Sequence, residues 1–430
     1  MANSFDSNIS TKLMRQFLAS FESQRVLTKT VNTQMFSGKF DPTSGTTIDI
    51  KRPHQYKSVR SSDGNLVTAS ASTAPIISGK ATATVQNYIT VWLEWTNVDE
   101  ALKLDQLKEI TDPAAEEMVV ELEDSFASYM IANSGLTYGN PGTVIDAWSD
   151  IAGQNSFMKS LGIPSGPKYS AISPFVLQNL AAAQTGLSAD PSRLVQTAWE
   201  EAQIPGMFGG LKAISSNALG TYTAGTNADR TGSLASTPTA TYLSVKDTMK
   251  QTLALADLGT SGGTITAGET LEFTGTGANA RSHVQLKNGN TVFGADGAAK
   301  KFRCTVTADA TVSTAGTATV SVAGPAIFET GGAYNTISKA LTSGDVVTIK
   351  ETASTEYQPS LFYHKDAFSV TTVKLPKLYS TDTVAWTKDG MTMRVSKYSS
   401  GSENIQRVRF DLLPAFSTLN PFFAGKGYGL

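Results

Sequence analysis

Few side chains in this sequence could carry out catalysis or hold a metal ion. Cys304 is the single cysteine. The three histidines fall in separate predicted segments, without acids or cysteines at metal-ligand spacing, and are His54, His283 and His364. GMFGGLK and AGKGYGL contain glycine and lysine but lack phosphate-loop spacing. We therefore interpret the histidines as surface or packing residues and Cys304 as a buried hydrophobe. The sequence predicts no enzyme, no cofactor and no metal site.

Two segments of the chain carry net charges of opposite sign. Residues 97–135 hold ten acids and two lysines, a net charge of −8, whereas residues 51–80 hold five bases and one acid, a net charge of +4. The acids spread around a predicted helix instead of converging, which favours a solvated or partner-facing surface over a metal or acid–base site. Opposite patches fix the register of docking. The candidate inter-subunit contacts are Lys51, Arg52, Lys57, Arg60, Glu116, Glu117, Glu121, Glu123 and Asp124.

The acidic residues are positioned by a predicted helix from Pro113 to Ser134. Asp112 is a suitable N-cap, Pro113 suits the first helical position, and Gly135 is a natural stop. At about 1.5 Å per residue this helix would be roughly 33 Å long. A shorter helical segment, ALKLDQLKEI, precedes it. One apolar stripe at three- and four-residue steps is expected from Ala115, Met118, Val119, Leu122, Phe126, Tyr129 and Met130.

The basic residues are positioned by a predicted extended arm. TTIDIKRP alternates as a strand does, and ATATVQNYITVWLEW is a second extended run; between them lies a polar stretch with an Asp63-Gly64 turn signal. This stretch has little apolar content of its own, so the arm needs something else to lie on. We predict that each arm lies across an acidic helix, within one subunit or between subunits.

The flanking segments complete a mixed α and β pattern. In residues 1–36, apolar residues at four-residue spacing predict an amphipathic helix that packs on a partner or on the body of the protein rather than on a membrane. Residues 143–220 are predicted to form helices and a strand. Ser173-Pro174 starts one helix, FVLQNLAAAQ, and SRLVQTAWEEAQ is a further helix. From residue 357, LFYHKDAFSVTTVKLP, MTMRVSKYSS and NIQRVRFDLLP are expected to be strands of one sheet.

Residues 222–356 differ in composition from the rest of the chain. TAGTNADRTGSLASTPTATY is predicted to be a linker, and regularly spaced short strands follow, with a hairpin signal at Asn288-Gly289. TITAGETLEF and ALTSGDVVTI are two similar turn-then-strand phrases. This pattern predicts a small barrel or sandwich, inserted in a domain whose halves lie on either side and able to fold independently.

Composition excludes several classes of protein. The 430 residues carry a net charge of −2, which gives no overall attraction to nucleic acid or anionic membrane. With 17% charged and 40% hydrophobic residues, the chain is expected to fold. No apolar run of about 18 residues occurs, and the N-terminus lacks the apolar stretch of a signal peptide, so the product is expected to stay in the cytosol until used.

This order of segments resembles that of the major capsid proteins of tailed bacteriophages, which have the Hong Kong-97 fold. IPGMFGGLKAISSNAL, SLFYHKDAFSV and RVRFDLLPAF resemble recurring capsid phrases, and the insertion is similar to the extra domain of short-tailed lambdoid phage coat proteins. The resemblance covers nearly the whole chain and implies an α+β fold with an inserted all-β barrel. The implied parts are an N-terminal arm helix (1–36), an extended β loop with peripheral strands (37–95), a spine helix region (96–142), the first part of the axial domain (143–222), the barrel (223–356) and a C-terminal axial and peripheral part (357–430).

The resemblance also implies a function. Copies would assemble as pentamers and hexamers into an icosahedral head, guided by a scaffolding protein, with double-stranded DNA packaged through a portal protein and enclosed without specific binding. The protein would be assembled in the host cytoplasm and end in the virion, away from membranes. Two other readings of the residues stay open: a glycan-binding tail or surface adhesin with a Thr/Gly-rich β domain, and a hydrolase with scattered catalytic residues.

Overall fold

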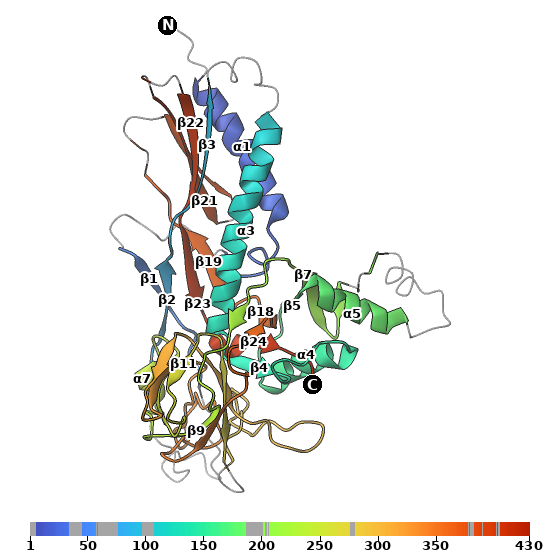
Figure 1. Ribbon diagram of the computed structural model, residues 1–430, viewed down its shortest axis with the longest axis vertical. Helices are drawn as coiled ribbons and strands as arrows, with labels where there is room; N and C mark the ends of the chain where they lie inside the picture. The colour runs from blue at the N-terminus through green and yellow to red at the C-terminus, as the bar shows by residue number, and fades with distance from the viewer. Residues whose placement is uncertain are drawn as a thin grey trace. The chain divides into compact units, whose positions relative to one another are not determined.

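The computed structural model of the protein contains two compact units (Figure 1). The structure describes residues 6–33, 45–56, 58, 76–96, 107–185, 201–202, 204, 206–275, 280–376, 378, 382–388, 390–400, 402 and 405–430. The first unit comprises Met1–Asp49, Thr82–Ala127 and Phe368–Thr418. The second comprises Ile50–Ala81, Ser128–Ala367 and Leu419–Leu430.

Two helices pack on the strands of the first unit. Helix α1 (Asp6–Gln24) is the predicted amphipathic helix, and it packs on the body of the protein: the ring of Phe17 stacks on Phe410 with centroids 4.0 Å apart. Helix α3 (Leu107–Asn133) begins in the first unit, and its last residues, from Ser128, belong to the second. In the first unit, the ring centroids of Phe126 on α3 and of Phe416 are 5.1 Å apart. No helix in the described part of the chain is long and apolar enough to cross a membrane.

The long helix begins six residues before the predicted start. Pro113 lies inside α3 instead of opening it, and part of the predicted lead-in segment is continuous with it. A proline at this position removes the hydrogen bond to the carbonyl of residue 109, which costs about 3 kcal/mol in a helix interior. Thr111, Ala114 and Ala115, on both sides of the proline, are buried in the first unit. Their burial offsets the cost of the missing hydrogen bond. At about 1.5 Å per residue, the helix is roughly 40 Å long.

The strands of the first unit form two sheets of four. One sheet has the order β20-β21-β22-β3 and is antiparallel throughout; the other has the order β1-β2-β23-β19. The two extended runs predicted for the arm are thus confirmed as β1, β2 and β3, although β3 joins a different sheet. The strands are β1 (Thr47–Lys51), β2 (Lys80–Val85), β3 (Ile89–Thr96), β19 (Phe368–Thr372), β20 (Asp382–Lys388), β21 (Met391–Ser400), β22 (Ile405–Leu412) and β23 (Pro414–Thr418).

The second unit contains a six-stranded mixed sheet built from both sides of the insertion. Its order is β4-β24-β18-β5-β7-β6. Helix α5 (Pro174–Thr185) starts where predicted, because the hydroxyl of Ser173 accepts a hydrogen bond from the backbone N–H of Val176 at 3.3 Å. The other elements are β4 (Leu136–Tyr138), α4 (Trp148–Ser160), β5 (Lys168–Ile172), β6 (Met207–Phe208), β7 (Leu211–Ser215), β18 (Ser360–His364), the short helix η3 (Pro421–Phe423) and β24 (Ala424–Gly427). The predicted helix SRLVQTAWEEAQ falls almost entirely outside the described residues.

The sequence predicted that the strands after residue 357 form one sheet, and this prediction is wrong. A turn at Lys365-Asp366 splits LFYHKDAFSVTTVKLP into β18 and β19, which join different sheets. The turn is held by His364, whose carbonyl accepts from the N–H of Ala367 at 2.9 Å. Its Nδ1 also accepts from the N–H of Asp366 at 3.2 Å. Because β21 and β22 pair with β3 instead, the three predicted segments contribute to three sheets.

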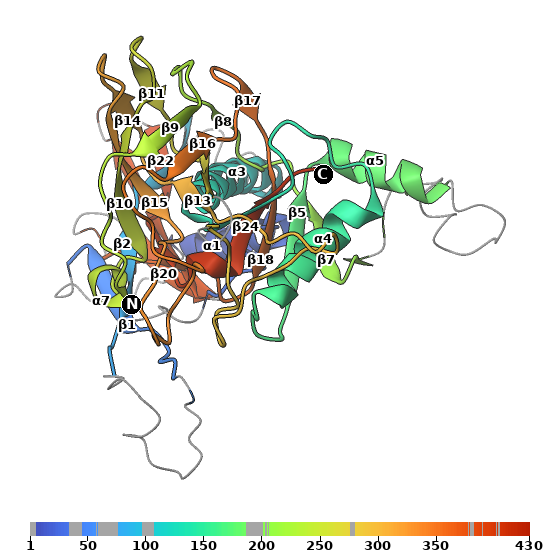
Figure 2. The same cartoon turned by 90° about the horizontal axis from the view of Figure 1, so that it is seen from below.

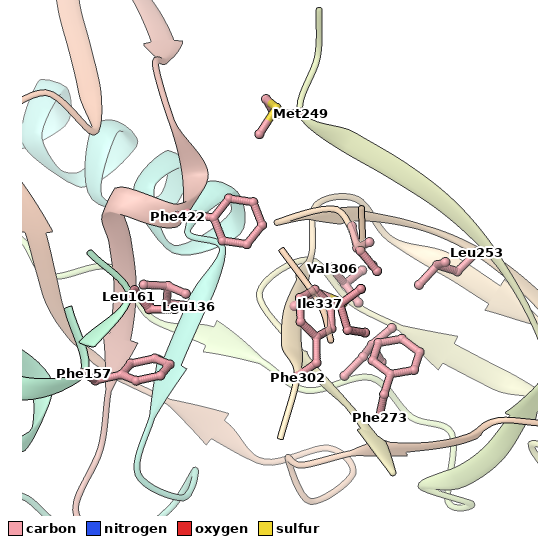
Figure 3. Packing of buried hydrophobic residues seen from close by; sticks show 14 of the residues in the cluster. Leu136, Phe157, Leu161, Met249, Leu253, Phe273, Phe302, Val306, Ile337 and Phe422 are labelled. Carbon is pink, nitrogen blue, oxygen red and sulfur yellow. The ribbon is translucent and has the colours of Figure 1, made fainter. Parts of the chain in front are cut away.

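The insertion forms a closed six-stranded barrel, which confirms the predicted all-β domain (Figure 2). Its strand order is β10-β15-β13-β12-β16-β9, and the two similar phrases supply the neighbours β12 and β16. Side chains converge inside, including Leu253, Phe273, Phe302 and Val306 (Figure 3). The barrel strands are β9 (Thr231–Leu234), β10 (Lys250–Ala256), β12 (Thr270–Thr274), β13 (Arg303–Val306), β15 (Ala318–Ala323) and β16 (Val346–Ile349). Two further strand pairs are β11 (Gly263–Ile265) with β14 (Ala310–Val312) and β8 (Tyr222–Thr223) with β17 (Glu356–Tyr357). The region also contains helix α7 (Tyr242–Val245).

The predicted linker contains a barrel strand. Strand β9 closes the barrel between β10 and β16, within a segment that composition alone marked as a connection. A side chain at Gly232 would place its Cβ 2.5 Å from the carbonyl oxygen of Ala256 and 2.9 Å from Leu258. Gly232 is therefore required by close packing between strands, and it does not indicate a flexible connection.

Candidate functional site

Four of the predicted acidic contact residues form one exposed face of α3, which we call the acidic face: Glu116, Glu117, Glu121 and Asp124. The opposite side of the helix is buried in the first unit, with Ala115, Met118, Leu122 and Phe126 at most 1% exposed. The apolar stripe therefore turns these carboxylates outward. Within the described part of the chain, none of the four has an ion-pair partner.

The fifth acid of this group, Glu123, serves the chain's own fold. It is 3% exposed, and its Oε1 accepts hydrogen bonds from the backbone N–H groups of Val26 at 2.5 Å and Thr28 at 3.3 Å. The hydroxyl of Thr28 donates a third at 3.3 Å. Burial raises the pKa of the Glu123 carboxyl, although these hydrogen bonds oppose the shift. Glu123 thus fixes the segment after α1 to the helix α3.

Substituting Glu123 separates its hydrogen bonds from its charge. Glu123→Ala is expected to lower the free energy of unfolding by about 1–3 kcal/mol, because buried backbone donors lose their acceptor. Glu123→Gln keeps an acceptor oxygen and removes the cost of a buried charge, so its loss should be smaller. Urea unfolding of both variants, beside Glu121→Ala on the acidic face as control, measures the difference. Equal stability of Glu123→Ala and Glu121→Ala would contradict this role.

The basic candidates have different environments. Lys51 is exposed at the end of β1, and Lys57 and Arg60 lie outside the described residues. Arg52 is only 9% exposed. Its Nε donates to the carbonyl oxygen of Lys80 at 2.8 Å, and its Nη1 donates to the carbonyl oxygen of Leu419. The structure therefore assigns Arg52 to packing within the chain, and Lys51 remains the described basic candidate with an exposed side chain.

The histidines and the cysteine are separated in the structure. His54 is exposed, whereas His283 and His364 are buried at different places in the second unit. Cys304 is 1% exposed, and burial raises the pKa of its thiol. Among the described residues, no three His, Cys, Asp or Glu side chains are grouped so that they could hold a metal ion.

A polar network around Lys426 was not predicted from the sequence. Lys426 on β24 is fully buried; its Nζ donates to the carbonyl oxygen of Gly268 and, at 2.8 Å, to the hydroxyl of Thr270 on β12. Glu351 lies 3.9 Å from this ammonium, and it accepts from the N–H of Thr270 and from the hydroxyl of Tyr222, at 2.8 and 2.9 Å. This network joins the barrel to the strand β24 of the six-stranded sheet, so the insertion is fixed to its host sheet by buried polar groups.

The described geometry contains an exposed charged helix face and buried structural networks, which suit association more than catalysis. A family model described as "P22 coat protein - gene protein 5" matches residues 1–429. The chain belongs to the P22 coat protein family. The predicted resemblance to tailed-phage coat proteins is thereby confirmed, and the family is a structural one.

One relative of similar sequence agrees with this assignment, and two solved structures align with the chain at low identity. A major capsid protein of Acyrthosiphon pisum secondary endosymbiont phage 1 is 40% identical over 432 residues, covering 100% of both chains. A solved structure from Mycobacterium phage Che8 aligns at 10% identity over 94% of this chain and 90% of that chain, with a TM-score of 0.46. The capsid structure of the cyanophage P-SCSP1u aligns at 12% identity over 90% and 84%, with a TM-score of 0.41.

The coat protein is therefore a structural component of an icosahedral phage capsid, where it self-assembles into the shell. This outcome favours the shell interpretation over the glycan-binding adhesin that the Thr/Gly-rich barrel had also allowed. The sequence did contain a signal for Glu123. It follows Val119 by four residues and precedes Phe126 by three, which places it at the edge of the apolar stripe of α3. No comparable pattern marks Lys426, which lies between two glycines.

Proposed function

We propose that neighbouring copies of the coat protein are joined by the arm of one copy, residues 51–80 between β1 and β2, lying on the acidic face of α3 of the next. The observation that supports this contact is the exposure of Glu116, Glu117, Glu121 and Asp124 without an ion-pair partner in the described part of the chain. Residues 51–80 carry the complementary charge of +4 against −8 in residues 97–135. Such complementarity fixes which surfaces meet and in which register.

The family resemblance supports a wider assembly scheme. We propose that the copies form pentamers and hexamers, that a scaffolding protein guides closure, and that double-stranded DNA enters through a portal protein in the host cytoplasm. The net charge of −2 suits a container that must be filled and emptied, because tight phosphate binding would oppose both steps.

A charge-swap experiment tests the arm contact. Lys57→Glu/Arg60→Glu in the arm is expected to reduce the assembly rate about tenfold while the thermal midpoint changes little, because each exposed pair contributes about 0–1 kcal/mol but recurs in every subunit. Glu116→Lys/Glu117→Lys on the acidic face should have the same effect. Combining both pairs should restore assembly, since opposite charges then meet again. Light scattering during assembly and electron microscopy of the products provide the measurement.

The control is a pair of charge reversals on exposed barrel lysines, Lys287→Glu/Lys339→Glu, which changes the net charge equally. Assembly of this control should stay near the parent rate. If the arm reversal assembles normally, or if the combined variant stays as impaired as either pair alone, the arm does not lie on the acidic face.

A further inference from the structure

The root of the arm belongs to the unit that contains the barrel. Ile50–Ala81 group with the second unit, whereas the residues directly before and after this segment group with the first. The boundary between the two units therefore falls within β1 and within β2. These are the strands by which the outgoing and returning segments of the arm join the β1-β2-β23-β19 sheet. Contacts made by this root determine how the arm is held.

Arg52 is the central residue of the root. Its backbone N–H donates to the carbonyl oxygen of Gly79 at 2.9 Å, and its Nε donates to the carbonyl oxygen of Lys80 at 2.8 Å, so it ties the outgoing and returning segments together. Its Nη1 donates to the carbonyl oxygen of Leu419, in the segment that leads to η3. One planar guanidinium thus connects three backbone segments, a geometry that a lysine ammonium on a flexible stem does not reproduce.

The barrel side of the root is equally close. A Cβ added at Gly79 would lie 2.6 Å from the carbonyl oxygen of Lys246 and 2.7 Å from the hydroxyl of Tyr242 on α7. The backbone N–H of Gln55 donates to the hydroxyl of Tyr334 at 3.0 Å, and the rings of Tyr242 and Tyr334 are parallel with centroids 3.7 Å apart. Both segments of the root therefore rest on one tyrosine pair of the insertion.

The cost of burying Arg52 indicates a specific role. Burial lowers the pKa of its guanidinium to about 10, so the group still carries its charge at neutral pH. A buried cation is tolerated when its donors find acceptors, and here the acceptors are main-chain carbonyls at the base of the arm. An apolar residue would satisfy the packing without this cost, but it would leave those carbonyls without the donor that connects them.

We propose that Arg52 is a positioning residue and that the inserted barrel, through Arg52, Gly79, Tyr242 and Tyr334, sets the direction in which the arm leaves the subunit. The barrel would thereby act on the contacts that the arm makes with another copy. This inference rests on the proposed arm contact for its consequence in assembly, but the positioning itself is a property of the single subunit and is measured there.

A distance measurement in the unassembled, full-length protein tests the positioning. Spin labels are placed on Ser58→Cys in the arm and Leu243→Cys on α7, both exposed positions, while Cys304 is too buried to react. In the parent, a single narrow distance distribution is expected. In Arg52→Gln the distance distribution should broaden to roughly twice that width, because the root opens locally when the hydrogen bonds of the Arg52 guanidinium are lost. Lys339→Gln, which removes an exposed barrel cation, should leave the distribution narrow.

Two further variants keep the test decisive. The distance distribution of Arg52→Lys should also be broad, since one ammonium cannot reach both carbonyl acceptors. If only the positive charge of Arg52 mattered, lysine would restore the narrow distribution. If Arg52→Gln fails to fold, Gly79→Ala is used instead, because its methyl group displaces the root from α7 while Arg52 is kept. A narrow, unchanged distribution in the folded variants would overturn the inference. A broad distribution with normal shell assembly would support the positioning role and would count against the arm contact between copies.

Discussion

Replacing Lys426 by methionine is expected to lower the free energy of unfolding of the coat protein by about 3–5 kcal/mol, because a buried ion network then loses one partner. Methionine matches the length of the lysine stem, so packing on β24 is nearly conserved. What is lost is the ammonium that lies among Glu351, Glu269 and the carbonyl of Gly268. Burial lowers the pKa of Lys426 to about 8, although both carboxylates oppose this, so the group is charged at neutral pH.

A double-mutant cycle separates the network from simple packing. Glu351→Gln alone removes the carboxylate and should also destabilise the protein, whereas the double variant Lys426→Met/Glu351→Gln buries no unpaired charge at this pair and should recover part of the loss. Urea unfolding curves give the four free energies. Lys365→Met, at an exposed position beside β18, serves as the control and should change stability by at most about 0.5 kcal/mol. A loss below about 1 kcal/mol for Lys426→Met would show that the network contributes little.

The elements that could be predicted from the sequence are those whose apolar pattern is local. The amphipathic stripe of α1 and the N-cap Ser173 of α5 each carry the information within one segment. Regularly spaced strands predicted a small barrel or sandwich, and the structure has the closed barrel. Helix α3 was found as well, but its first residues were assigned to a separate segment, because Pro113 is a helix-start signal whose cost is met by tertiary packing.

Features that depend on distant partners could not be predicted. Strand β9 contains one large apolar residue, Leu234, and only its place between β10 and β16 makes it a strand. The sheet membership of β18 and β19 is decided by partners up to about 200 residues away along the chain. Among the candidate contacts, Glu123 has the same side chain as the exposed Glu121, and Arg52 is a cation like the exposed Lys51. Their roles depend on what folds against them.

The second large effect is expected in acid. His283 is 1% exposed and lies against Phe302 and Phe157, with ring centroids 4.8 and 5.5 Å apart. Its Nε2 accepts the backbone N–H of Arg303 at 3.1 Å, so the neutral ring carries its proton on Nδ1. Nδ1 has no hydrogen-bond partner in the described part of the chain. Burial, with a smaller contribution from the charge of Arg303, lowers the pKa of this imidazole to about 3. Protonation of Nε2 would break the hydrogen bond and leave a charge among aromatic rings.

The sign of the pH dependence follows from this shift. The unfolded chain binds a proton at His283 near its ordinary pKa of 6.5, and the folded chain does so only near 3. Stability from this group is therefore complete above about pH 6.5 and is lost as the pH falls toward 3, at about 1.4 kcal/mol per pH unit and about 5 kcal/mol in total. His283→Gln does not titrate and can still accept from Arg303, so its unfolding free energy should fall less steeply over this range.

The measurement is the unfolding free energy of parent and His283→Gln at several pH values between 7 and about 3.5, where the difference between the two curves isolates this histidine from the carboxylates. His54→Gln is the matched control, because the imidazole of His54 lies in solvent. Its curve should run parallel to that of the parent. If the His283→Gln curve is parallel as well, then His283 is not held neutral by its burial between α4 and the barrel, and the acid sensitivity of the coat protein comes from its carboxylates alone.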